Sequence, residues 1–184
     1  MEIKSSLFSA SSLLINTNIA RKPFSKVLLI GYGDPEREDR GIAWHIFLNL
    51  ARCLNRTIPV EPREGFYSSG FPADMIFVPH LVPSLAERLV DYERACFITA
   101  HTEPEKEAIV WKELSPETAV VADPPVIDPG ICIATTFDLF GHAPEAVYLS
   151  VRAFSSGRSR SLSLPASRLL PEITEQLLGW LAKK

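Results

Sequence analysis

The stretch Val27-Leu-Leu-Ile-Gly-Tyr-Gly-Asp-Pro-Glu-Arg-Glu-Asp-Arg-Gly41 contains the pattern that decides the fold class. Its four leading apolar residues, Val27 to Ile30, are typical of a central strand of a parallel sheet, which is buried on both faces. Two glycines break this strand. From about Gly41 to Leu54, apolar residues recur at intervals of three and four, which predicts a helix. A strand, a glycine turn and a helix in this order open a βαβ unit.

The same alternation continues along the chain. We predict strands at 75–78, 95–100 and 146–151, an edge strand at 108–114, and helices at 83–90, 130–140 and 166–182. These elements predict an α/β fold: a three-layer sandwich with a mostly parallel sheet of about five strands and helices on both faces. We expect residues 26–184 to form a single domain. Residues 1–25, rich in Ser and Asn, are expected to be a flexible N-terminal extension.

The composition excludes several classes of protein. The chain has 184 residues, 46% of them hydrophobic and 22% charged, as in one ordinary globular domain. The 19 Lys and Arg residues against 22 Asp and Glu residues give a net charge of −3, so we expect no nucleic-acid partner. No apolar run is long enough to span a membrane, and the N-terminus lacks the pattern of a signal peptide, so we expect no membrane insertion and a cytoplasmic location.

The three cysteines, Cys53, Cys96 and Cys132, lie far apart in the sequence and among apolar neighbours. No CxxC pair occurs, which disfavours a cysteine metal site. We therefore expect three small buried thiols in a reducing compartment.

The loop after the first strand is rich in carboxylates, which include Asp34, Glu36, Glu38 and Asp39. A dinucleotide-binding loop would have a third glycine at position 36 and no acidic residues against the pyrophosphate. The loop is better suited to a cation, or it is simply a solvated turn.

Two histidines follow neighbouring predicted strands: His80 comes after 75–78, and His101 lies on the same strand face as Thr99. Taken singly, each is interpreted as a structural residue. Together with Asp39 they provide one carboxylate and two imidazoles at one edge of the sheet, a set that suits zinc or nickel.

Several motifs, in the same order along the chain, resemble those of the hydrogenase maturation proteases. Residues 27–43 resemble the opening of that family, a strand followed by G-x-G-N-P-x-R-x-D-D-G. Further matches are His80-Leu-Val-Pro-Ser-Leu-Ala86, Asp128-Pro129, Phe140-Gly-His-Ala-Pro-Glu-Ala146 and Leu162-Ser163. The similarity extends from about Lys26 to Leu181.

The resemblance implies an endopeptidase that removes a C-terminal extension from the large-subunit precursor of nickel-iron hydrogenase. It implies no tightly bound cofactor, since the nickel is carried by the substrate. Three of the family's metal-ligand positions are substituted here, by Arg40, by Thr99 and, in a later loop, by Val126. Asp39 is the remaining acid and the candidate catalytic residue.

Two hypotheses follow from these substitutions. Either the chain is a non-catalytic relative that binds the precursor, or another partner's C-terminal tail, without cutting it, or the metal site has moved to Asp39, His80 and His101. In both cases the glycines Gly31, Gly33 and Gly41 are candidates for close backbone approach to a bound substrate.

Overall fold

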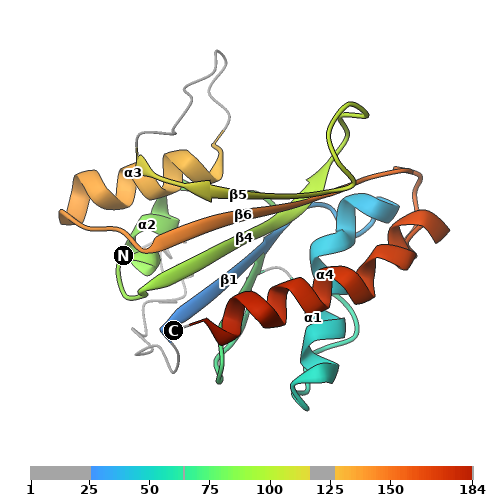
Figure 1. Ribbon diagram of the computed structural model, residues 1–184, viewed down its shortest axis with the longest axis horizontal. Coiled ribbons are helices and arrows are strands. Elements are labelled where there is room, and N and C mark those ends of the chain that lie inside the picture. The colour runs from blue at the N-terminus through green and yellow to red at the C-terminus, as the bar shows by residue number, and fades with distance from the viewer. Residues whose placement is uncertain (1–25, 64, 117–126, 184) are drawn as a thin grey trace, which may run out of the picture.

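The computed structural model describes residues 26–63, 65–116 and 127–183, and its centre is a six-stranded sheet (Figure 1). The strand order is β2-β3-β1-β4-β6-β5. The inner strands β3, β1, β4 and β6 are parallel, and the edge strands β2 and β5 are antiparallel to their neighbours. The strands are β1 (Val27–Tyr32), β2 (Phe66–Ser68), β3 (Asp74–Val78), β4 (Arg94–His101), β5 (Ile109–Leu114) and β6 (Glu145–Arg152).

Helices cover both faces of this sheet, which confirms the predicted three-layer sandwich. Helices α1 (Ile42–Cys53) and α4 (Leu164–Ala182) lie on one face, and α2 (Ala86–Leu89) and α3 (Pro129–Phe140) lie on the other (Figure 1). Two 3₁₀ turns, η1 (Glu38–Gly41) and η2 (Pro83–Leu85), lead into α1 and α2. Among the described residues, no helix is both long and apolar enough to cross a membrane.

Two apolar clusters form the core, one on each side of the sheet. Alternation along β1 sends Leu29 toward α1 and α4, and Leu28 and Ile30 toward α2 and α3. All three side chains are fully buried, as the uninterrupted apolar run predicts for a central parallel strand.

The sheet has one more strand than the expected five. The additional strand, β2, falls in a stretch rich in glycine and proline that has no strand pattern of its own. It is held by tertiary contacts instead: the Arg56 guanidinium donates hydrogen bonds to the Ser68 carbonyl at 3.1 Å, to the Ser68 hydroxyl at 2.8 Å and to the Ala73 carbonyl at 2.6 Å. Sequence periodicity does not report contacts of this kind.

The expectation of three buried thiols is wrong at one position. Cys96 and Cys132 are buried, and burial raises the pKa of Cys132 to about 12 and that of Cys96 further. Cys53 is exposed because it is the last residue of α1 and points away from the core. The predicted extension 1–25 lies outside the described residues.

Candidate functional site

The first loop and the serine-rich loop after β6 meet at the carboxyl ends of the parallel strands. In open α/β sheets this is the edge at which ligands bind. Asp39, in the 3₁₀ turn η1, links the two loops and is fully buried. The site is therefore best described outward from this carboxylate.

The Asp39 carboxylate accepts four hydrogen bonds. Its Oδ2 accepts from the backbone N–H groups of Phe154 and Ser155, each at 2.9 Å, and from the Ser163 hydroxyl at 2.7 Å. Its Oδ1 accepts from the Ser163 N–H at 2.7 Å. Both oxygens are thus occupied by donors of the serine-rich loop, so this carboxylate is not free to bind a metal or activate water.

Neighbouring residues of the first loop bind the same segment. The Glu38 N–H donates to the Ser159 carbonyl at 2.7 Å, and the Glu38 carboxylate accepts from the Ser155 hydroxyl and, at 3.0 Å, from the Gly157 N–H. Glu36 forms an exposed ion pair of 2.6 Å with Arg160. The acidic residues of this loop therefore stabilise a loop–loop contact.

Each predicted substrate-binding glycine has a packing reason within the chain. A Cβ atom on Gly33, whose φ is +142°, would lie 2.3 Å from the Arg40 carbonyl oxygen, and one on Gly41 would lie 2.7 Å from the Pro35 Cα. A Cβ on Gly31 would lie 3.0 Å from the ring of Phe47. These close approaches account for the glycines without a bound substrate.

The two predicted histidine ligands lie in different environments. His80 is exposed in the loop after β3. His101 is buried at the end of β4, where its Nδ1 lies 2.8 Å from the Ser150 Oγ. Burial lowers the pKa of His101, which favours the neutral imidazole.

The structure does not assemble Asp39, His80 and His101 into the predicted metal site. His101 lies on the sheet face covered by α2 and α3, as its alternation with Phe97 requires, whereas Asp39 contacts the loop that enters α4 on the other face. In the part of the chain that the structure describes, no three His, Cys, Asp or Glu side chains are grouped closely enough to hold a metal ion.

The residues at the three positions where the resemblance implies metal ligands do not supply an alternative metal site. Arg40 is exposed and Thr99 is buried, while Val126 lies outside the described residues. A guanidinium has no lone pair for a metal and repels cations. The donor set at this edge therefore does not fit nickel.

Sequence reasoning missed a cluster of hydroxyl groups beside Thr99. Tyr32, at the end of β1, lies near the side chains of Thr99 and Tyr148. Burial raises the pKa of Tyr32, and Tyr148 raises it further, so the phenol stays protonated. The alternation of β1 was a usable signal, because it places Tyr32 on the same face as Leu28 and Ile30.

Of the comparisons with known proteins, the one with solved structures identifies the fold. No family model matches the sequence, and a search of the curated proteins finds no match. Among solved structures, the chain is similar to the hydrogenase maturating endopeptidase HybD from E. coli, with 14% identity and a TM-score of 0.61 over 84% of this chain and 91% of that one. It is also similar to the NiFe hydrogenase maturation protease HybD from Thermococcus kodakarensis, with 15% identity and a TM-score of 0.56 over 85% and 99%.

A third solved structure, the hydrogenase 2 maturation peptidase from a Thaumarchaeota archaeon, shares 13% identity and gives a TM-score of 0.55 over 86% of this chain and 99% of that one. The three similarities cover nearly the whole of each neighbour, so they concern the complete fold and not a shared fragment. The chain therefore has the fold of the hydrogenase maturation proteases.

Proposed function

We propose that this protein acts in the maturation of a nickel-iron hydrogenase by binding the C-terminal tail of the large-subunit precursor in the cytoplasm without cutting it. The observation that carries this proposal is the Asp39 carboxylate, whose two oxygens accept four hydrogen bonds from the chain's own loop. The fold supports the choice of partner, because the solved neighbours are named as hydrogenase maturation proteases.

Arg40 favours binding over cleavage. It is exposed at the position where the resemblance places a metal-ligating acid. Replacing a carboxylate by a guanidinium turns a site that attracts cations into one that attracts carboxylates. The negatively charged end of a C-terminal tail suits such a group.

A second candidate function is the endopeptidase activity itself, which the similarity of the whole fold to proteases favours. In that case the nickel belongs to the precursor and polarises the scissile carbonyl or the attacking water. Asp39 is then the acid that remains, and it would have to release hydrogen bonds to the serine-rich loop.

The experiment incubates the full chain with a nickel-loaded large-subunit precursor and measures the precursor's mass and its affinity for the chain. We expect binding with no loss of mass, and weaker binding to a precursor without its extension. Arg40→Glu should weaken binding about tenfold, because it reverses a charge facing the tail. The matched control Arg168→Glu, an exposed position on α4, should leave binding unchanged.

Loss of the extension would support the endopeptidase candidate and overturn the proposal of binding alone. Equal affinity for precursors with and without the extension would overturn the proposed binding to the C-terminal tail.

A further inference from the structure

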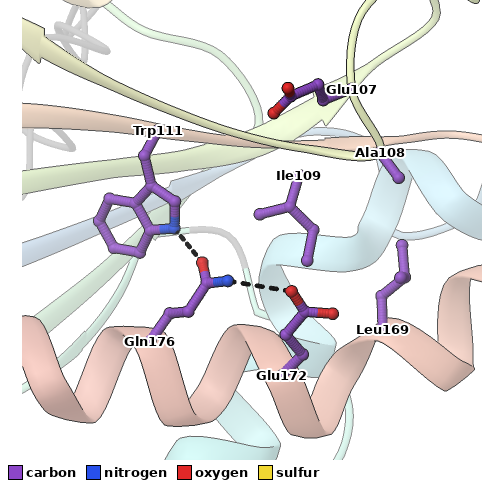
Figure 2. A pocket seen from close by; sticks show the side chains of 7 residues that line it. All are labelled: Glu107, Ala108, Ile109, Trp111, Leu169, Glu172 and Gln176. Atoms are coloured by element: carbon purple, nitrogen blue, oxygen red, sulfur yellow. Dashed lines mark hydrogen bonds between the residues drawn. The ribbon is translucent and has the colours of Figure 1, made fainter.

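A groove runs between β5 and helix α4. It is lined by Ile109 and Trp111 from β5 and by Leu169, Glu172 and Gln176 from α4, with Glu107 and Ala108 just before the strand (Figure 2). Its cavity volume is about 460 Å³. The groove is thus large enough to accept several side chains.

The strand that borders the groove is an edge strand. Within the described ranges, β5 pairs only with β6, so the backbone N–H and C=O groups on its outer side have no strand partner. Such an edge can pair with an extended segment of another chain, and the backbone hydrogen bonds then supply affinity.

A chain of hydrogen bonds fixes the polar wall of the groove. The Trp111 indole N–H donates to the Gln176 amide oxygen, and the Gln176 amide nitrogen donates to the Glu172 carboxylate at 3.1 Å (Figure 2). Trp111 is half-buried and packs against the core, which holds its indole ring in place. Through Gln176, this ring restricts the position of the exposed Glu172 side chain. The carboxylate is therefore positioned in advance of binding.

The groove carries negative charge. Glu107 and Glu172 are exposed, and none of the lining residues is a lysine or arginine. Glu113 is also exposed, and strand alternation places it on the same face of β5 as Trp111. A strand added beside β5 would bring every second side chain to this acidic face.

The opposite face of β5 is different in character. Val110 and Leu114 are half-buried there, with the exposed Lys112 between them. The alternate side chains of an added strand would therefore meet largely apolar neighbours on that face.

We infer that the groove between β5 and α4 binds an extended segment of a partner protein by strand addition, with lysine or arginine at every second position of that segment. The carboxylates of Glu107, Glu113 and Glu172 would select the basic side chains. This inference concerns the sheet edge and does not depend on the partner being a hydrogenase precursor.

The test uses the full chain and a synthetic peptide of alternating lysine and valine, labelled for fluorescence anisotropy. We expect saturable binding that weakens with added salt, and amide chemical-shift changes concentrated in 109–114 and 169–176. A peptide of alternating glutamate and valine should bind at least about tenfold more weakly.

Two exposed substitutions test the role of charge without disturbing the core. Glu172→Gln should weaken peptide binding about threefold, and the double variant E113Q/E172Q about tenfold. The matched control Glu87→Gln makes the same change on α2, which covers the opposite face of the sheet, and should have no effect.

Four results would overturn the inference: no binding of the basic peptide, equal binding of the acidic peptide, shifts confined to other elements, or unchanged affinity in E113Q/E172Q. A second copy of this chain could also pair with β5, and sedimentation velocity tests for such a dimer. A dimer that protects the β5 amides would show that a second copy, and not a partner protein, occupies this edge.

Discussion

Asp39 shows how a residue that matches an active-site motif can have both carboxylate oxygens hydrogen-bonded within its own chain. It lies in a loop of carboxylates at the ligand-binding edge of the sheet, which made it the best candidate for a catalytic acid. Its donors come from Phe154, Ser155 and Ser163, more than 100 positions later in the chain. No local pattern reports that these N–H groups fold onto the carboxylate.

We predict that Asp39→Asn lowers the free energy of unfolding by about 2–4 kcal/mol. The amide nitrogen would replace one buried acceptor oxygen and face N–H donors that then lack a partner. Urea unfolding would measure the change. Asp138→Asn, on the exposed side of α3, is the control and should stay within about 0.5 kcal/mol of the wild type. A similarly small effect of Asp39→Asn would show that its four bonds contribute little.

His101 provides a prediction about pH. Burial lowers its pKa below the value of about 6.5 that it regains on unfolding. Below pH 6.5 the unfolded chain binds the proton before the folded chain does. The free energy of unfolding therefore decreases as the pH falls from neutral through the folded-state pKa. The slope is at most about 1.4 kcal/mol per pH unit for one such group.

His101→Asn should flatten the pH dependence of unfolding between about pH 7 and 5, since asparagine keeps a polar group near Ser150 and does not titrate. Some dependence will remain, because burial also lowers the pKa of His45. An unchanged profile in His101→Asn, with an NMR titration that places the His101 pKa at or above 6.5, would contradict the prediction.

At the scale of elements, the caps of α3 and α4 follow from the sequence. Asp128 precedes Pro129 and accepts from the Ile131 N–H at 2.8 Å, and Ser163 caps α4 before Pro165. Gly141 ends α3 with a φ of +74°. Long apolar periodicities and caps are local signals, which is why these boundaries could be predicted closely. Strand β2 could not be predicted, because it is held by Arg56 and by its pairing with β3 and not by an apolar pattern of its own.

Two glycines with open space around the missing Cβ form a matched pair. Gly141→Ala should destabilise the fold by about 1 kcal/mol, because a side chain is strained in the left-handed conformation. Gly179→Ala, inside α4, should stabilise it by about 0.5–1 kcal/mol, because alanine is the better helix former. Thermal unfolding of both variants would test this, and shifts of the same sign would refute the conformational explanation.

At the scale of the whole molecule, the sequence predicts the fold but does not predict the arrangement of the site. The arrangement of layers follows from apolar patterns distributed over the entire chain, so single substitutions do not obscure it. The site depends on a few side chains that must converge in space. His80 follows β3 and His101 ends β4, but β1 lies between these two strands in the sheet, so the expectation that the histidines leave neighbouring strands is wrong.

The residues at this edge of the sheet predict how the whole molecule responds to nickel in the absence of any precursor. Arg40 repels a cation, and Thr99 is a poor metal ligand. The Asp39 oxygens already accept hydrogen bonds from Ser163 and from the residues after β6. Among the described residues, this edge of the sheet therefore has no set of side chains that is free to bind nickel. We therefore expect isothermal titration with Ni²⁺ to give no site tighter than about 10 μM, and the melting temperature to stay the same, because only a ligand that favours the folded state raises it. Tight binding that His80→Ala and His101→Asn both abolish would show instead that the two histidines approach one another in solution and that the relocated metal site forms.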